Sequence, residues 1–271
     1  MDFLEIIRII FLSIVQGITE WLPVSSTGHM ILIEEFLNFS HSPEFWSVFL
    51  VVIQLASVLA VVTTFFKQLN PFEKVNKKIT ISNDKLQLWL KIGIASIPAA
   101  IIGVFFDDLV PESPWIVAIA LIFYGIVFII IENINRDKKP QIITLASISY
   151  KLAFIVGIFQ AIAIIPGTSR SGATIIGGLM LGMSRKTIAE FTFFLAIPAM
   201  AGASLLRIAR FGLNFTDAEW ATLIIGCTVA FIVSVLTIKF LLGFIKNRDF
   251  KPFAYYRIIL GAIVFTYFFL V

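Results

Sequence analysis

Residues 45–66, FWSVFLVVIQLASVLAVVTTFF, form an apolar stretch without a single charged side chain. A helix needs about 20 apolar residues to cross the hydrocarbon core of a bilayer, and this stretch is long enough. Five more apolar stretches occur, and a turn at either end would complete the short ones: 92–106, 114–131, 191–206, 221–238 and 258–271. We therefore expect an all-α integral membrane protein with six transmembrane helices.

The composition supports lipid as the main solvent of this chain. Hydrophobic residues make up 59% and charged residues 14% of the sequence, whereas soluble domains are about one quarter charged. With a mean hydropathy of +0.96, no soluble core of this length could bury so much apolar surface. The only cysteine, Cys227, excludes a disulfide framework and a thiolate metal cluster. Asp2 and Glu5 replace the basic start of a signal peptide, so we expect no cleavage.

Two further regions, 3–39 and 147–184, are apolar but interrupted at their midpoints. The interruptions are QGITEWLPVSSTGH at 16–29 and PGTSRSGAT at 166–174. Proline, glycine and hydroxyl residues at a midpoint favour a helix–loop–helix hairpin that enters and leaves the membrane on one side. Irregular backbone at membrane depth is tolerated only where it is buried in protein or lines a cavity. We expect two re-entrant hairpins, whose second helices begin near Met30 and near Ser171.

The distribution of charge predicts the topology, because lysine and arginine concentrate in cytoplasmic loops. Residues 67–91 carry six lysines, including Lys74 and Lys77, whereas 107–114 carry only the acidic residues Asp107, Asp108 and Glu112. The first connection is therefore expected inside and the second outside. Further basic residues assigned to the cytoplasm are Arg136, Lys138, Lys139, Lys151, Arg185, Lys186, Lys246, Arg248 and Lys251. The net charge of +4 reflects such loops, and no nucleic-acid-binding module is present.

This topology divides the single membrane domain, 1–271, into halves 1–140 and 141–271 of opposite orientation. Each half contains a hairpin followed by three spans, which is the pattern of an inverted repeat. Short sequence echoes support the division. SSTG at 25–28 and FLVVI at 49–53 match SRSG at 169–172 and FFLAI at 193–197 at one common offset, and GITE at 17–20 matches GIFQ at 157–160 at a slightly smaller one.

An inverted repeat brings the two broken loops together near the middle of the membrane. Both loops lead into helices, whose unpaired N–H groups and positive dipole ends suit an anion. Gly28, Gly167 and Gly172 would allow the backbone to approach that anion closely.

Arg170 is the most informative single residue, because a guanidinium at membrane depth is costly. It could form a structural ion pair with Glu20, or it could bind a phosphate with two parallel hydrogen bonds. Neighbouring hydroxyl groups favour the phosphate, since they add donors for the same oxygens; they belong to Thr168, Ser169, Ser171 and Thr174.

Glu20 is the only ionisable residue between Arg8 and His29. A buried carboxylate is either a neutral, hydrogen-bonded acid or a charged group beside Arg170 or a divalent cation. Gln16 lies four residues earlier, on the same helical face, and could add a carbonyl oxygen to that cation site.

His29 follows Ser25, Ser26 and Thr27, so its imidazole could reach a hydroxyl group. A serine beside a histidine forms a nucleophile–base pair. The alternative is a histidine that only satisfies a local hydrogen bond.

These motifs resemble those of a known family. QGITEWLPVSSTGH is similar to the (E/Q)xxxE–PVSSTGH signature of the undecaprenyl-pyrophosphate phosphatases, the bacitracin-resistance proteins of bacteria, and PGTSRSGAT is similar to their PGxSRSxxT signature. The resemblance covers nearly the whole chain. It implies hydrolysis of undecaprenyl pyrophosphate in the bacterial cell membrane, a site that opens to the extracytoplasmic side, and a divalent cation, Mg²⁺ or Ca²⁺.

The resemblance also assigns roles by position. It implies a metal site at Glu20 and Gln16, where glutamine leaves one carboxylate instead of two. The catalytic residues are expected to be Glu20, Ser26, His29 and Arg170; we favour Ser26 as the group that attacks phosphorus, with His29 or water as the alternatives. The resemblance carries over Thr27, Ser169 and Thr174 as substrate-binding residues, and the two loops themselves add Ser25, Gly28, Gly167, Thr168 and Ser171. The alternative function is a transporter or flippase of a lipid phosphate or small anion. The sequence leaves a homodimer open.

Overall fold

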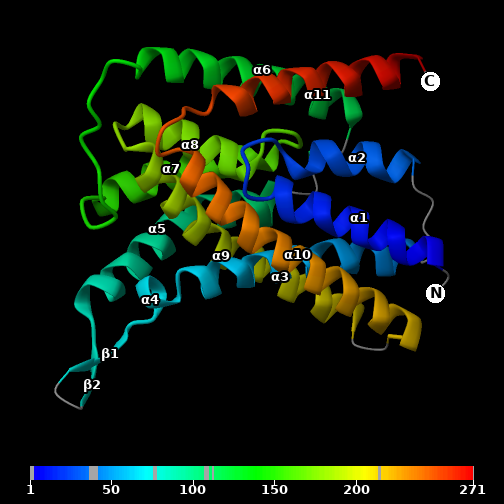
Figure 1. Cartoon of the computed structure of the whole chain (residues 1–271), viewed down its shortest axis with the longest axis horizontal. Coiled ribbons are helices and arrows are strands. Elements are labelled where there is room, and N and C mark those ends of the chain that lie inside the picture. The colour runs from blue at the N-terminus through cyan, green and yellow to red at the C-terminus, as the bar shows by residue number, and fades with distance from the viewer. Residues whose placement is uncertain are drawn as a thin grey trace.

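The computed structural model describes residues 3–36, 42–75, 78–106, 110–111, 113–212 and 215–270. The described chain is mostly helical (Figure 1). Its elements are α1 (Phe3–Thr19), α2 (Ser26–Phe36), α3 (Pro43–Thr64), α4 (Phe66–Leu69), β1 (Phe72–Val75), β2 (Lys78–Ile81), α5 (Asn83–Phe106), α6 (Pro114–Ile134), α7 (Tyr150–Ala161), the 3₁₀ turn η2 (Ile162–Ile164), α8 (Arg170–Met180), α9 (Arg185–Phe211), α10 (Asp217–Phe244) and α11 (Lys251–Leu270).

Among the described residues, 5 helices are long and apolar enough to cross a membrane: α3, α5, α6, α10 and α11. Their outer faces expose large apolar side chains, including Phe105 on α5, Ile119 on α6 and Leu236 on α10. A soluble monomer rarely exposes so extensive an apolar surface, so these faces indicate a multi-pass membrane protein. The sixth stretch expected to span, 191–206, lies within α9 and remains a prediction.

In a helical membrane protein one would expect an irregular connection after α3. Instead, this connection contains two short strands. Strands β1 and β2 pair antiparallel, with Phe72 opposite Ile81, and form a hairpin that extends from the helices (Figure 1). Apolar and polar residues alternate in KITI at 78–81, the period of a strand. Of the residues used to predict the topology, Lys77, Asp107, Asp108 and Glu112 lie outside the described residues.

Both interrupted regions form helix–loop–helix hairpins. Helices α1 and α2 pack against each other, as do α7 and α8. The second helices start at Ser26 and Arg170, so α2 begins before the expected Met30. Ser26 and Arg170 therefore both occupy the first residue of a helix.

Two pairs of helices cross in matching ways. Gly17 of α1 lies against the backbone of α10, where an added Cβ would be 2.9 Å from the carbonyl oxygen of Ala230. Gly157 of α7 lies against the backbone of α5. A Cβ added there would come closer to the carbonyl oxygen of Ala95 than real Cβ atoms come to any atom. Small residues at crossings let membrane helices approach closely. These glycines open the GITE and GIFQ segments, so the two echoed segments have the same packing role.

Helices α6 and α11 lie side by side along one edge of the molecule (Figure 1). Each places a glycine on the other. A Cβ at Gly125 would lie 3.0 Å from the carbonyl oxygen of Ala254, and one at Gly261 would lie 2.9 Å from that of Ala118. The contact is therefore reciprocal, as at an interface between two copies of one element.

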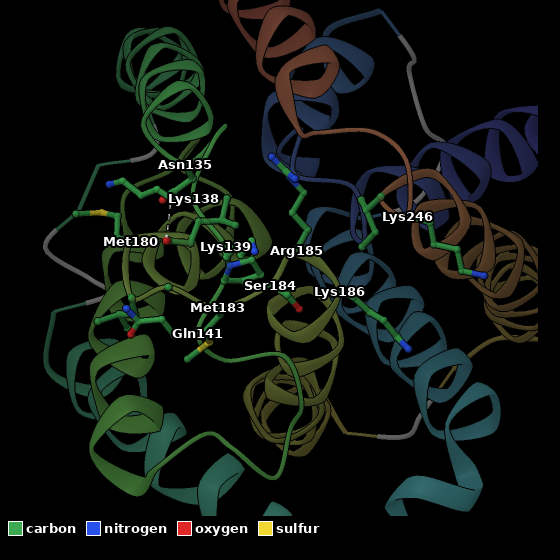
Figure 2. A pocket seen from close by; sticks show the side chains of 15 residues that line it. Asn135, Lys138, Lys139, Gln141, Met180, Met183, Ser184, Arg185, Lys186 and Lys246 are labelled. Atoms are coloured by element: carbon green, nitrogen blue, oxygen red, sulfur yellow. Dashed lines mark hydrogen bonds between the residues drawn. The ribbon is translucent and has the colours of Figure 1, made fainter.

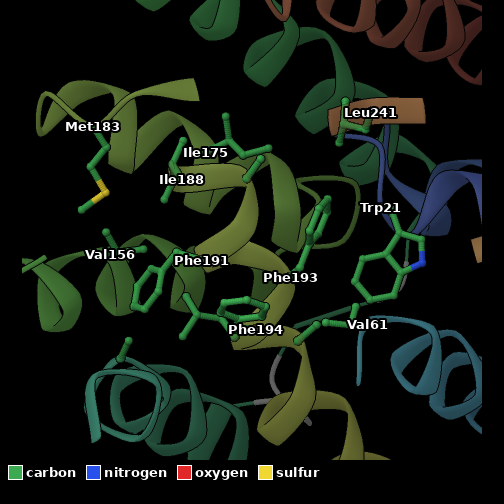
Figure 3. Packing of buried hydrophobic residues seen from close by; sticks show 14 of the residues in the cluster. Trp21, Val61, Val156, Ile175, Met183, Ile188, Phe191, Phe193, Phe194 and Leu241 are labelled. Carbon is green, nitrogen blue, oxygen red and sulfur yellow. The ribbon is translucent and has the colours of Figure 1, made fainter. Parts of the chain in front are cut away.

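The main apolar core joins the first hairpin to α9 (Figure 3). Trp21, in the loop after α1, is fully buried and meets Phe193 of α9 edge to face, with ring centroids 5.5 Å apart. Such a pair contributes about 1 kcal/mol beyond the area it buries. Because Trp21 follows Glu20 directly, this contact anchors the backbone that carries Glu20.

Candidate active site at the two broken loops

The two loops share an unusual backbone conformation. Ser25 and Ser169 have φ angles of 70° and 72°, in a region that L side chains rarely adopt. The hydroxyl oxygen of Ser25 accepts from the N–H of Gly28 at 3.4 Å, and that of Ser169 accepts from the N–H of Gly172 at 3.2 Å. Each serine thus caps the helix that starts at the next residue. Strained backbone of this kind concentrates at functional sites.

Glu20 and Arg170 meet where the two loops face each other. Arg170 Nη2 donates to Glu20 Oε1 at 3.4 Å, and Nη1 donates to the carbonyl oxygen of Thr192 at 2.9 Å. The guanidinium also lies 5.9 Å from the ring centroid of Trp21. Its buried Nε has no hydrogen-bond partner among the described residues. The predicted proximity of Glu20 and Arg170 is confirmed, and the guanidinium keeps donor capacity for an anion.

The second carboxylate oxygen of Glu20 faces the other residues of the first motif. Oε2 accepts from the Gln16 side-chain amide at 3.0 Å and from the Ser26 hydroxyl at 3.4 Å. With Arg170 on Oε1, three donors converge on one carboxylate, the arrangement that an ionised carboxylate accepts. The structure therefore brings Gln16, Glu20, Ser26 and Arg170 into one cluster.

His29 lies beside this cluster but contacts a different hydroxyl group. Its Nδ1 is 2.7 Å from the carbonyl oxygen of Ser25, and its Nε2 is 2.7 Å from the hydroxyl of Tyr256. A carbonyl oxygen can only accept, so Nδ1 carries a proton and the Nε2 of the neutral ring accepts from Tyr256. The two rings stack, with centroids 5.5 Å apart. Among the described residues, the Ser26 hydroxyl therefore contacts Glu20, whereas His29 contacts Tyr256 and the backbone of Ser25.

Two of the hydroxyl groups expected to bind substrate hold the protein together. Ser171 Oγ donates to the carbonyl oxygen of Leu22 at 3.3 Å, which links the second loop to the first. Thr174 Oγ1 donates to the carbonyl oxygen of Arg170 at 2.9 Å and accepts from Thr192 Oγ1 at 2.8 Å. These contacts fix the start of α8, and with it the guanidinium of Arg170.

The remaining expected residues differ in environment. Thr168 is fully buried, and its hydroxyl has no partner among the described residues. Ser169 and Ser171 share a hydrogen bond of 3.1 Å, whereas Thr27 is exposed. Gly167 has a φ of +88°, and a Cβ there would lie 2.6 Å from the carbonyl oxygen of Val117. No other residue fits this position, so its glycine has a structural reason.

Arg257 is the main residue that the sequence did not indicate. It is fully buried, and its Nη2 donates to the carbonyl oxygens of Gly167 and Thr168, both at 2.9 Å. Its Nη1 donates to the carbonyl oxygen of Pro23 at 3.4 Å. One guanidinium thus ties the first loop to the second. The sequence signal was an arginine directly before the last apolar stretch, where it reads as part of a basic loop.

The oxygen atoms around Glu20 are too few to bind a divalent cation without help from the substrate. Within the part of the chain that the structure describes, no group of three or more histidine, cysteine or acidic residues could hold a metal ion. Glu20 offers one carboxylate, with Gln16 and Ser26 beside it. Mg²⁺ is commonly bound by one or two protein carboxylates plus substrate phosphates. The residues fit a cation that a phosphate helps to bind.

Known proteins match this chain over a range that includes both motifs. The family model described as bacitracin resistance protein BacA matches residues 9–263, which include both loops. The chain belongs to this family. It is 53% identical to a protein of Enterococcus faecalis named undecaprenyl-diphosphatase, over 97% of each chain. It is 55% identical to an undecaprenyl-diphosphatase of Lachnoclostridium phytofermentans, over 100% of this chain and 99% of the relative.

Proposed function

We propose that this protein hydrolyses undecaprenyl pyrophosphate to undecaprenyl phosphate and phosphate, which recycles the carrier lipid for cell-wall synthesis. The observation that supports this most is the meeting of Arg170 with Glu20 and Ser26 between two loops that lie far apart in the sequence. The names of the relatives agree with it. Phosphoryl transfer needs mainly positioning and charge stabilisation, which such a cluster provides.

In the proposed mechanism, Arg170 and the N-termini of α2 and α8 bind the phosphates. The Ser26 hydroxyl loses its proton to Glu20, whose Oε2 lies 3.4 Å away, and attacks the terminal phosphorus in line. The bond from that phosphorus to the bridging oxygen breaks, and undecaprenyl phosphate leaves. Water then attacks the serine phosphate, Ser26 regains a proton, and phosphate departs.

A divalent cation, Mg²⁺ or Ca²⁺, is part of the proposal. Glu20 and Gln16 would hold it, the latter through its carbonyl oxygen after rotation of the amide. When bound, it would neutralise charge on the phosphates. His29 is assigned to orienting α2 through Tyr256, with a role as an alternative base for Ser26.

The test is phosphate release by the purified protein in detergent, where no compartments exist. We expect release from undecaprenyl pyrophosphate, a smaller rate with chelator, and none in Ser26→Ala. Native folding of the variant is checked by its thermal unfolding. A transporter or flippase would release no phosphate under these conditions, so a silent wild-type protein would overturn the proposal.

The proposed architecture has six spans, two re-entrant hairpins and inverted halves 1–140 and 141–271, in the bacterial cell membrane with the site open to the extracytoplasmic side. The matching crossings at Gly17 and Gly157 support it. In a Cys227→Ala background, Lys74→Cys should react with an impermeant thiol reagent only from the cytoplasm, and Ala218→Cys only from outside. Reaction of both from one side would contradict the inverted repeat.

A further inference from the structure

A cavity of about 610 Å³ lies away from the two broken loops, and none of the site residues line it (Figure 2). It is placed where two candidate spans end: Asn135 follows α6, and Ile245 and Lys246 follow α10. The connections between α6 and α7 and between α8 and α9 form its remaining walls. Two transmembrane helices end at this level, so the cavity lies at the depth of the lipid headgroups.

The charge of this cavity is of one sign. Its lining includes no acidic residue and the following cationic ones: Lys138, Lys139, Arg185, Lys186 and Lys246. A cavity of about 410 Å³ around Lys67 and Lys91 differs, because Asp84 and Glu190 line it as well. In the described chain, Lys186 pairs with Glu190, but no carboxylate lies within ion-pair distance of the lysines at 138, 139 and 246.

The walls of the cavity are held in place by hydrogen bonds. Arg185 Nε donates to Glu132 Oε1 at 3.0 Å, and the N–H of Phe250 donates to the same oxygen at 2.9 Å. The side chain of Glu132 is fully buried. The N–H of Gln141 donates to the carbonyl oxygen of Gly182 at 2.9 Å, which ties the α6–α7 connection to the α8–α9 connection. A charged ligand would therefore meet a site that is already formed, with little ordering cost.

Apolar side chains complete the lining. Met180 is exposed and lies beside the basic residues in Figure 2, and the mostly buried side chains of Leu179, Met183 and Ile245 also line the cavity. Methionine adapts well to flexible apolar ligands. We propose that this cavity binds a phosphate-bearing anion, the headgroup of an anionic phospholipid whose glycerol and first acyl carbons contact the apolar residues. Each nearby lysine or arginine adds to such binding at a membrane surface.

The test compares lipids that differ in charge. Native mass spectrometry of the detergent-solubilised protein, titrated with phosphatidylglycerol or phosphatidylcholine, counts bound lipids and gives their affinity. We expect one tight phosphatidylglycerol and no comparable phosphatidylcholine. The variant Lys138→Gln/Lys139→Gln should weaken the phosphatidylglycerol about tenfold or more. The control Lys74→Gln/Lys78→Gln removes the same charge from the exposed β1–β2 hairpin and should leave the affinity unchanged.

A second titration, with inorganic phosphate alone, separates the two sources of the same chemistry. If inorganic phosphate competes with phosphatidylglycerol in the wild type but not in Lys138→Gln/Lys139→Gln, the result would support the anion site. Binding of phosphate without binding of phosphatidylglycerol would overturn the lipid as its ligand. An equal loss of affinity in the control variant, or no preference for the anionic lipid, would overturn the site itself. Thermal unfolding of both variants should match that of the wild type, because all four lysines are exposed.

Discussion

The two hairpins have the same backbone design but very different surroundings. In α8 every residue from Ser171 to Leu179 is buried, whereas in α2 only Gly28 and Met30 are. The buried hairpin carries Arg170, which needs to stay fixed. The more exposed hairpin carries Ser26 and His29. In the proposed mechanism, α8 holds the Arg170 guanidinium in a fixed position for the anion, and α2 presents Ser26 and His29 from the more exposed hairpin.

The largest effect is expected at the guanidinium. Arg170→Lys keeps the charge but loses the planar fork, in which Nη1 and Nη2 donate separately to Thr192 and Glu20 and which can bind a phosphate with two parallel hydrogen bonds. Loss of one charged donor to a transition state costs about 3 kcal/mol, so kcat/KM should fall on the order of a hundredfold. Phosphate release in detergent measures it. Activity close to that of the wild type would show that Arg170 only balances the charge of Glu20.

The next effect tests the difference in packing. A Cβ at Gly178 of α8 would overlap the inner side-chain atoms of fully buried Ile188, so Gly178→Ala should destabilise the protein by about 2 kcal/mol. Gly28 of α2 has more room, because its nearest neighbour is a terminal methyl of Leu121 at 2.9 Å. Gly28→Ala should therefore cost less than half as much. Thermal unfolding in detergent compares the two, and an equal loss would mean that α2 is packed as firmly as α8.

A smaller effect is expected at the contact between α2 and Tyr256 of α11. Tyr256→Phe removes the hydroxyl that donates to His29 Nε2 but keeps the stacked ring. Loss of one such hydrogen bond costs about 1 kcal/mol, so turnover should fall about fivefold. Activity is compared with that of His29→Gln under the same conditions. No change in Tyr256→Phe would remove Tyr256 from the positioning of His29.

Much of this arrangement could be predicted from sequence, because charged residues in an apolar chain stand out. Glu20 and Arg170 are such residues, and their contact at 3.4 Å is confirmed. The helical character is confirmed as well, and the five described helices that are long and apolar enough to cross a membrane agree with a multi-pass membrane protein. The glycines in both motifs marked the loops, and at Gly167 a positive φ beside a close backbone contact explains the glycine.

What the sequence did not reveal depends on tertiary contacts. Arg257 and Tyr256 lie at the polar start of the last helix, where basic and aromatic residues are common at a membrane surface. Only the packing of α11 against α6 turns Arg257 towards the loop carbonyls. The partner of His29 was also hidden, because sequence neighbours suggested a serine hydroxyl and the fold supplies Tyr256. The β1–β2 hairpin depends on pairing between two short strands, which the lysine-rich sequence of this connection does not indicate.

The central claim is that the two hairpins form one catalytic unit, and a double-mutant cycle tests it directly. It compares kcat/KM for phosphate release by the wild type, Glu20→Gln, Arg170→Lys and the double variant. When two residues act as one unit, removing either one already removes the function of the unit. The double variant should therefore have about the same kcat/KM as the less active of the two single variants. If the two losses multiply instead, Glu20 and Arg170 act independently, and the two loops do not share one site.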